Sequence, residues 1–307
     1  MTGRIIGTGS YSPELVWDNN KLAEMVETND EWIRERTGIA RRHIEKEASV
    51  THMAIVAAQN AMETCKECNA EDIDAIIVCT IAQEEVLPSV SCQVQAAIGA
   101  TNAFCFDLKA ACSGFVFAYN TCVAYMNMGL IKNALIIGVE KISAITDWTD
   151  RSSCILFGDG AGAAVITACE GTGAVMMKCD GSRGEVLTCP AGSTLVMNGQ
   201  EVFKFAVRSV PEAVAEVMNQ MQITKEDVSY YILHQANRRI VESVAKRLGE
   251  PIEKFPMNLE EYGNTSSASI PLLLDELYRG GKLPQGSRLI MAGFGAGLSW
   301  GASYITV

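Results

Sequence analysis

The sequence predicts an α/β fold, because short apolar runs of the β type alternate with helical stretches. The strand-like runs lie at residues 74–80, 134–140, 230–234 and 288–294. The helical stretches lie at residues 51–65, 88–99 and 208–221. Continuously apolar strands between helices are typical of a sheet that is covered on both faces. We therefore expect a buried sheet packed between helices.

A weak internal repeat indicates two halves with one topology. The segment "EDIDAIIVC" (71–79) aligns without a gap with "EDVSYYILH" (226–234), and "GAAVIT" (162–167) aligns with "GASYIT" (301–306). Each half is too short to cover its sheet alone, so the two halves must pack together. Chance similarity between buried β runs is the alternative explanation.

We expect the halves to meet near residue 170, where a glycine-rich stretch has the composition of a crossover connection. Its glycines are Gly171, Gly173, Gly181, Gly184, Gly192 and Gly199. The predicted division is an N-terminal half at residues 1–169 and a C-terminal half at residues 170–307.

Composition limits the possible partners and compartments. The 307 residues are 48% hydrophobic, enough for a sizeable core, and the formal charge of −11 disfavours general binding to nucleic acid or an anionic membrane. The N-terminus has no signal-peptide pattern and no segment has the length of a membrane span, so we expect a cytoplasmic protein. The 11 cysteines are then expected to be free thiols.

Metal binding is not expected. Cys65 and Cys68 form a single CxxC motif, whereas a zinc site needs four ligands. The three histidines are His43, His52 and His234, and none complements the motif at a suitable spacing. Two cysteines on a helix are the simpler interpretation.

Cys112 is the strongest candidate for a nucleophile. Residues 113–125 are bulky and almost uncharged, which predicts a buried helix with Cys112 at its first turn. Helix N-termini carry unpaired N–H groups and partial positive charge, which favour a thiolate and can stabilise an oxyanion. The small neighbours Ala110, Ala111 and Gly114 leave room for a substrate. A buried structural cysteine is the alternative.

His234 and Asn264 are candidate partners of this nucleophile. His234, in "LHQAN", follows an expected strand at the sheet edge where α/β proteins place functional groups, and Asn264 lies in the polar turn "EEYGNTSSASIP". Either residue alone is more often structural than functional. The C-terminal "MAGFGAGLSWGA" (291–302) adds glycines that let backbone N–H groups approach a ligand, or that form a structural hairpin.

Taken together, these residues resemble β-ketoacyl-acyl carrier protein synthase III, a family of thiolase-fold condensing enzymes. The matching segments are "NDEWIRERTGI" (29–39), "ACSGF" (111–115), "DRSSCILFGDGAGAAV" (150–165), "HQANRRI" (234–240), "YGNTSSASIP" (262–271) and "GFGAGLSWG" (293–301). They follow the family's order over most of the chain. The Cys-His-Asn set separates this branch from elongating synthases, which use Cys-His-His, and from thiolases, which use a second cysteine.

The resemblance implies a thiolase-like five-layer αβαβα fold of two pseudo-repeated halves, a homodimer, and a reaction without a cofactor. Cys112 would attack an acyl-CoA thioester to form an acyl-enzyme. The N–H groups of Cys112 and Ala296 would form the oxyanion hole; many members have glycine in place of Ala296. His234 and Asn264 would donate hydrogen bonds to the thioester carbonyl of malonyl-acyl carrier protein (malonyl-ACP) during decarboxylation.

The resemblance also assigns a CoA site. Trp32 and Arg151 would sandwich the adenine, Thr28 would touch it, Arg36 would meet a phosphate, and Asn237 would line the pantetheine tunnel. Stacking on flat faces and pairing of arginine with phosphate fit these residue types. A half-buried tryptophan and solvated arginines are the alternative.

The remaining assignments concern the ACP partner and the acyl pocket. The expected basic rim for ACP comprises Lys204, Arg238, Arg239, Lys246 and Arg247, although Glu242 could instead pair with Arg238 or Lys246. Leu87 and Phe294 are assigned to the acyl pocket, with Leu87 supplied to the partner subunit. Members restricted to acetyl often carry phenylalanine at the position of Leu87, so the smaller leucine implies room for branched or longer primers.

Two other functions stay open. The first is a same-fold acyltransferase or secondary-metabolite ketosynthase that moves the acyl group to another acceptor. The second is a catalytically silent acyl-CoA-binding or scaffold protein, which would have no need of a complete Cys-His-Asn set.

Overall fold

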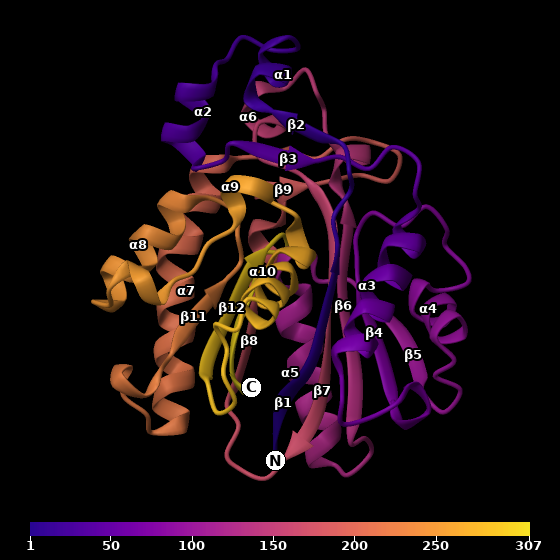
Figure 1. The fold of residues 1–307 in the computed structure, drawn as a ribbon. Coiled ribbons are helices and arrows are strands. Elements are labelled where there is room, and N and C mark those ends of the chain that lie inside the picture. Colours follow the sequence, from indigo (N-terminus) through magenta and orange to yellow (C-terminus); the bar gives the residue numbers. More distant parts are fainter.

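The computed structural model describes residues 1–307 as thirteen strands and ten α-helices (Figure 1). The strands are β1 (Thr2–Tyr11), β2 (Val16–Asp18), β3 (Arg41–His43), β4 (Ala75–Cys79), β5 (Phe104–Leu108), β6 (Asn133–Lys141), β7 (Asp159–Cys169), β8 (Val175–Cys179), β9 (Leu187–Thr188), β10 (Val196–Met197), β11 (Tyr230–Leu233), β12 (Arg288–Gly295) and β13 (Ser299–Thr306). The helices are α1 (Asn19–Ala23), α2 (Asp30–Thr37), α3 (Val50–Thr64), α4 (Val90–Ile98), α5 (Gly114–Asn127), α6 (Arg151–Cys154), α7 (Gly199–Met221), α8 (Arg238–Leu248), α9 (Leu259–Tyr262) and α10 (Ser269–Arg279). Short 3-10 turns that matter below are η1 (Ala70–Asp72), η2 (Ala111–Ser113), η5 (Lys225–Asp227) and η7 (Ser266–Ala268).

Two sets of strands have the same internal topology. In the first, β4 pairs parallel with β6, while β6–β7 and β7–β1 are antiparallel. In the second, β11 pairs parallel with β12, while β12–β13 and β13–β8 are antiparallel. The sets join through one parallel pairing, Arg4 with Thr306 on β1 and β13. The first set has one more strand, β5, at its outer edge beside β4.

The sequence repeat falls on equivalent elements of these two sets. Residues 71–79 run from η1 into β4, and residues 226–234 run from η5 through β11. Both turns are closed by a capping box, with Asp72 in one and Asp227 in the other. The second aligned pair falls on β7 and β13. The predicted fold of two pseudo-repeated halves is therefore confirmed, while the boundary at residues 169 and 170 stays a prediction.

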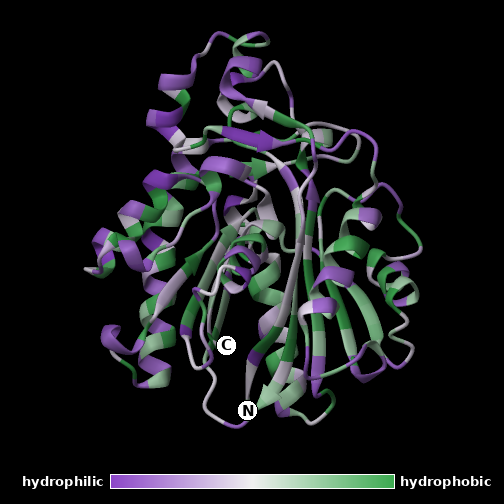
Figure 2. Cartoon of the chain, viewed as in Figure 1, coloured by the Kyte–Doolittle hydropathy of each residue, from purple (hydrophilic) through white to green (hydrophobic).

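The helices and the two sets of strands form five layers, because both faces of each set of strands are apolar and are covered by helices. Helices α3 and α4 cover the outer face of the first set, α7 and α8 cover the outer face of the second, and α5 and α10 lie between the two sets (Figure 1). Apolar side chains of α5 and α10 share one core with strands of both sets, and each outer helix pair has its own core. A helix in the middle layer must be apolar nearly all round, which explains the uncharged sequence of α5. In Figure 2 the long strands of the nine-stranded sheet are mostly green to white, whereas α2 is mostly purple.

Helix α7 begins nine residues earlier than predicted, at Gly199 instead of residue 208. Asn198 caps its N-terminus, since its side chain accepts from the Glu201 N–H. Pro211 lies inside the helix and removes the donor that would bind the Val207 carbonyl. Arg247 donates to that carbonyl instead, at 2.9 Å, so the proline is accommodated.

None of the helices combines the length and the apolar character that a membrane crossing requires.

Candidate active site

A pocket of about 810 Å³ is lined by residues of both halves and of helix α2. It brings together eight residues that the sequence singled out: Cys112, His234, Asn264, Ala296, Phe294, Trp32, Arg36 and Asn237. Thr28, Arg151 and Leu87 are not among its lining residues. The catalytic candidates thus converge from positions far apart in the sequence.

Cys112 lies on the 3-10 turn η2, directly before α5. Ala111, which begins this turn, has a φ of +45°, a strained value for alanine that costs of the order of 1 kcal/mol and turns the chain sharply into the pocket. The turn packs on β12, where an added Cβ at Gly295 would lie 2.8 Å from the Cys112 nitrogen. Glycine at 295 is therefore required for Cys112 to occupy this position.

The expectation that the helix terminus keeps Cys112 as a thiolate is not supported. Burial is the largest influence on this group and raises the pKa of the Cys112 thiol to about 12. Hydrogen bonding from the Ser266 hydroxyl and from the residue's own backbone opposes the rise but does not cancel it. Cys112 also precedes the first turn of α5 instead of lying in it, so it gains less from the helix terminus. The resting side chain is a thiol.

His234 directly follows β11 and is held by its neighbours as a hydrogen-bond donor. The Ser269 hydroxyl accepts from the Gln235 N–H at 3.2 Å and lies 2.7 Å from His234 Nδ1. Since Nδ1 is the one acceptor within reach of the Ser269 hydroxyl hydrogen, the serine donates to Nδ1, which leaves the proton of the neutral ring on Nε2. Burial lowers the pKa of His234 to about 3, so the ring is neutral at physiological pH.

Asn264 is fixed by three hydrogen bonds that leave its amide NH2 group to donate. Its backbone N–H donates to the Leu156 carbonyl at 2.8 Å, and its carbonyl accepts from the Gly158 N–H at 3.1 Å. Its side-chain Oδ1 accepts from the Ser266 N–H at 2.9 Å. His234 and Asn264 therefore present two uncharged donors, Nε2–H and Nδ2–H, in the pocket that holds Cys112.

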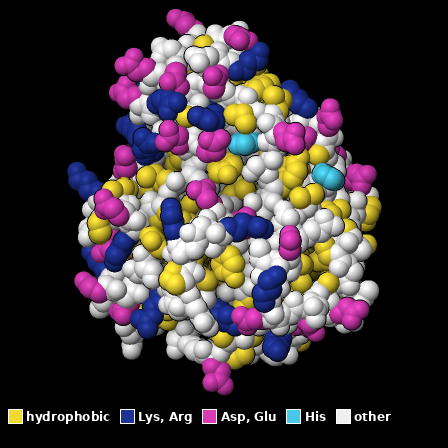
Figure 3. All heavy atoms as spheres, viewed as in Figure 1, with side chains coloured by type: hydrophobic (Ala, Val, Ile, Leu, Met, Phe, Trp, Pro, Cys, Tyr) yellow, Lys and Arg dark blue, Asp and Glu magenta, His cyan; other side chains and the backbone are white.

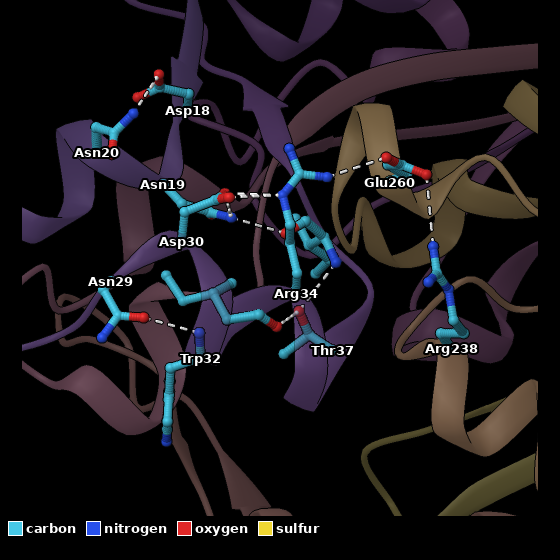
Figure 4. A network of polar contacts seen from close by, with 12 residues as sticks. Asp18, Asn19, Asn20, Asn29, Asp30, Trp32, Arg34, Thr37, Arg238 and Glu260 are labelled. Carbon is cyan, nitrogen blue, oxygen red and sulfur yellow. Dashed lines mark hydrogen bonds and ion pairs between the residues drawn. The ribbon is translucent and has the colours of Figure 1, made fainter.

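Trp32 lies at the mouth of the pocket, close to two guanidinium groups. The Cζ atoms of Arg151 and Arg36 lie 5.0 and 5.6 Å from its ring centroid. Asn29 caps α2 by accepting from the Trp32 N–H at 2.8 Å, which fixes the start of the helix that carries the ring (Figure 4). Thr28, just before this cap, has a buried hydroxyl with no hydrogen-bond partner.

Polar contacts tie α2 to α8 and α9 beside this mouth. Glu260 accepts from Arg34 at 3.1 Å and from Arg238 at 3.4 Å, so one carboxylate bridges two helices (Figure 4). The amide of Asn237 donates to the Arg36 carbonyl at 3.1 Å, while its Oδ1 caps α8. Asn237 lines the pocket as predicted, but both ends of its amide are already engaged.

The five basic residues expected to meet ACP all lie on α7 and α8, and Figure 3 shows Lys and Arg side chains on that flank of the molecule. Lys204 pairs with Glu201 at 2.8 Å, and Arg238 pairs with Glu260. The alternative that Glu242 pairs with Arg238 is therefore wrong. Arg239 lies 5.8 Å over the Phe203 ring, and Lys246 is exposed without an ion pair.

Leu87 and Phe294 lie in different settings. Phe294 is 3% exposed and packs edge-on against the His234 ring, with centroids 5.1 Å apart. Leu87 is 82% exposed and does not enter the pocket of its own chain. Its neighbour Val86 is 89% exposed, so this loop presents two apolar side chains to the outside.

Comparison with known proteins identifies the family. Residues 106–182 match the family described as "3-Oxoacyl-[acyl-carrier-protein (ACP)] synthase III", and residues 218–307 match its C-terminal part. The chain is 45% identical to "Beta-ketoacyl-[acyl-carrier-protein] synthase III" of Clostridium perfringens (strain SM101 / Type A), with 98% of each chain covered. The chain belongs to the 3-oxoacyl-[acyl-carrier-protein] synthase III family.

Solved structures agree with this membership of the synthase III family. The crystal structure of 3-oxoacyl-[acyl-carrier-protein] synthase III from Aquifex aeolicus VF5 is 43% identical, with a TM-score of 0.95 and coverage of 98% of this chain and 99% of that chain. The priming β-ketosynthase from the R1128 polyketide biosynthetic pathway is 34% identical, with a TM-score of 0.93 and coverage of 99% and 95%. The predicted thiolase-like fold is confirmed.

Several residues that shape the site were not found by reasoning from the sequence. Ser269 and Ser266 lie in the quoted motif "YGNTSSASIP", where the run of serines after Asn264 was an unused signal. Glu140, a carboxylate at the end of the apolar run 134–140, was another. The stretch interpreted only as a crossover also supplies pocket lining, through Leu187, Leu195 and Met197.

Proposed function

We propose that this chain catalyses the decarboxylative condensation of an acyl-CoA primer with malonyl-ACP, giving β-ketoacyl-ACP, CoA and CO2 and so initiating fatty acid synthesis. The observation that carries the proposal is the shared pocket of Cys112, His234 and Asn264, which holds one thiol and two neutral donors. Family membership supports the same reaction.

In the first half-reaction the Cys112 sulfur attacks the thioester carbonyl of the acyl-CoA. A new C–S bond forms to Cys112, the bond to the CoA sulfur breaks, and the thiol proton ends on CoA. The N–H groups of Cys112 and Ala296 stabilise the oxyanion, and the methyl group of Ala296 leaves its N–H available. The CoA adenine stacks with Trp32 and Arg151, near Thr28, while Arg36 meets a phosphate and Asn237 contacts the pantetheine.

In the second half-reaction malonyl-ACP loses CO2, and the electron pair of the broken bond moves onto its thioester carbonyl. The His234 Nε2–H and the Asn264 Nδ2–H donate to that oxygen as negative charge develops. Removal of one such donor typically costs about 3–4 kcal/mol of barrier. The enolate then attacks the acyl-enzyme and releases Cys112. The thioester itself accepts the electrons, so we propose that no cofactor takes part.

Other features support the expected partners. The basic rim of Lys204, Arg238, Arg239, Lys246 and Arg247 suits an acidic ACP. Edge strand β5 with Phe104, 44% exposed, and the exposed loop at Leu87 suit a homodimer in which Leu87 and Phe294 help to limit the acyl pocket. All 11 cysteines are free, which fits the reducing cytoplasm.

Intact-protein mass spectrometry tests this function. We expect a covalent acyl adduct after incubation with a panel of acyl-CoAs, and its loss with release of β-ketoacyl-ACP after malonyl-ACP is added. The variant Cys112→Ala should form no adduct. The variants His234→Ala and Asn264→Ala should still acylate but fail to decarboxylate malonyl-ACP. Absence of any adduct would favour a silent acyl-CoA binder.

A same-fold acyltransferase or secondary-metabolite ketosynthase is the second candidate. The structural similarity to the R1128 priming β-ketosynthase favours it specifically. The same adduct assay separates the two functions, because an acyl group that moves to an acceptor other than malonyl-ACP would contradict the primary proposal. The acyl-CoA that forms the adduct would then identify the acyl group that the protein transfers.

A further inference from the structure

The acylation half-reaction needs a group that removes the proton from Cys112. His234 is not available for this step, since Ser269 donates to its Nδ1 and the ring proton therefore occupies Nε2. Burial also makes the ring a weak base, with a pKa lowered to about 3. Another acceptor must therefore lie within reach of the thiol.

Glu140 is a fully buried carboxylate at the carboxyl end of β6, close to the nucleophile. Its Oε1 accepts from the hydroxyls of Ser266 at 3.1 Å and Ser267 at 2.8 Å. Its Oε2 accepts from the Ile81 N–H at 3.0 Å, with the Thr80 hydroxyl at 3.4 Å. All four partners are uncharged, so no cation neutralises this buried acid. Neither half-reaction described above gives Glu140 a role.

Ser266 connects Glu140 to the nucleophile. Ser266 and Cys112 both line the pocket, on the turns η7 and η2 that pack against each other, and the Ser266 hydroxyl acts to lower the pKa of the Cys112 thiol. The same hydroxyl donates to Glu140 Oε1, and the Ser266 backbone N–H donates to Asn264 Oδ1. A hydroxyl can accept from one group while it donates to another, so Ser266, which already donates to Oε1, can relay a proton from the neighbouring thiol to Glu140. Ser266 is kept here by a φ of +51°, a strained conformation at the first residue of η7.

We propose that Glu140 accepts the Cys112 proton through the Ser266 hydroxyl during acylation. As the sulfur bonds to the acyl carbon, the thiol proton passes to Ser266 Oγ, and the Ser266 hydroxyl proton passes to Glu140 Oε1. When the tetrahedral intermediate collapses, Glu140 returns its proton by the same path to the departing CoA sulfur. No oxidant or further reactant is needed, and the carboxylate is regenerated.

The electrostatics of Glu140 and Cys112 favour a negative charge on only one of the two groups at a time. Burial raises the pKa of Glu140 to about 7, and the nearby Glu140 charge adds to the rise in the pKa of Cys112. Transfer of the proton therefore exchanges one buried negative charge for another. The other titratable group facing Glu140 is Cys79 on β4, whose pKa is raised well above its usual value by burial, so it stays a thiol. Lys141 is directed away, toward the Ala48 carbonyl and Glu84.

The test compares three variants, Glu140→Gln, Ser266→Ala and Ser267→Ala, because Ser267 binds Glu140 without reaching Cys112. Single-turnover acylation by acyl-CoA is followed by intact mass between about pH 5.5 and 9. In the parent the rate should rise through a midpoint near 7, the pKa of Glu140. We expect Glu140→Gln and Ser266→Ala to acylate at least about tenfold more slowly and to lose this rise, whereas Ser267→Ala should retain it.

A second readout separates proton transfer from a purely structural role. Decarboxylation of malonyl-ACP in a Cys112→Gln background uses His234 and Asn264 but not the thiol. Acylation should fall at least about tenfold more than decarboxylation in both variants. Equal losses, or a parent-like pH profile in Glu140→Gln, would overturn the proposal. If Glu140→Gln does not fold, Ser266→Ala carries the test, since Ala111 shows that alanine adopts a similar φ in this chain.

The proposal rests on acylation by acyl-CoA, which is part of the proposed function. The rate of Cys112 alkylation by iodoacetamide over the same pH range makes the two failures distinguishable. If no acyl-CoA forms an adduct, the proposed function fails, but the alkylation profile still reports on Glu140. If adducts form and the alkylation profile is the same in all variants, only the proton path is wrong.

Discussion

Replacement of His234 by glutamine should make the protein less sensitive to acid, although it removes a residue of the active site. Protonation of the His234 ring is disfavoured in the folded state, where burial lowers its pKa to about 3 from an ordinary value of 6.5. The unfolded chain therefore binds more protons below pH about 6.5, and the folded state loses stability as pH falls from there toward 3. Above about pH 6.5 the contribution is complete.

The size of this effect follows from the difference between the two pKa values. Each pH unit below about 6.5 costs about 1.4 kcal/mol, so at about pH 4.5 the parent should have lost about 3 kcal/mol through His234. Glutamine keeps a donor and an acceptor of similar size but does not titrate. Carboxylates also titrate in this range, but they are common to parent and variant, so the comparison isolates the histidine.

Urea unfolding of the parent and His234→Gln at about pH 7.5 and about pH 4.5 measures the effect at a fixed protein concentration. The loss of unfolding free energy between the two conditions should be about 3 kcal/mol larger for the parent. Equal losses in the two proteins would refute the assignment of His234 as a ring kept neutral by burial. His52→Gln, at an exposed position outside the pocket, is the control variant and should lose as much as the parent.

Three further predictions concern the pocket. Gly295→Ala should slow acylation on the order of a hundredfold, because the added Cβ would lie 2.8 Å from the Cys112 nitrogen. Gly181→Ala, with open space around it, is the control and should not slow acylation. A parent-like rate in Gly295→Ala would contradict the close packing of η2 on β12. Trp32→Ala should raise KM for acyl-CoA about tenfold and leave kcat nearly unchanged. The effect should vanish with acyl-pantetheine, which lacks the adenine. An equal rise of KM with both substrates would show that Trp32 does not act by binding the adenine. Ser269→Ala removes the hydrogen-bond partner of His234 Nδ1 and should slow malonyl-ACP decarboxylation about tenfold, while the acylation rate changes less. Equal losses of rate in the two steps would contradict the assigned tautomer of His234.

The arrangement of strands could be predicted from sequence because it depends on local apolar runs and on a repeat. The aligned segments at 71–79 and 226–234 lie at equivalent points of the two halves, each entering its strand through a capped turn. The start of α7 could not be predicted in this way. Its N-terminal turns follow a glycine-rich stretch, and the carbonyl freed by Pro211 depends on Arg247, which is distant in sequence.

The chemistry of the site was only partly accessible to sequence reasoning. The motifs identified Cys112, His234 and Asn264 as candidates, and the fold brings all three into one pocket. The ionisation of Cys112 was predicted in the wrong direction, because the local effect of a helix terminus is smaller than the desolvation caused by the surrounding protein. The contact between Ser269 and His234 joins residues that are 35 positions apart, so no spacing rule indicates it.

The turns before the two central helices have the same backbone geometry but different chemical roles. Ala111 and Ser266 each open a 3-10 turn with a positive φ, of +45° and +51°, and each turn leads directly into a middle-layer helix, α5 or α10. The same backbone shape therefore occurs twice, once in each pseudo-repeat. The two turns carry different groups, since Cys112 lies on one and the backbone N–H of Ser266 on the other holds Asn264 Oδ1. A scaffold with two similar halves thereby holds a site whose two sides are chemically different.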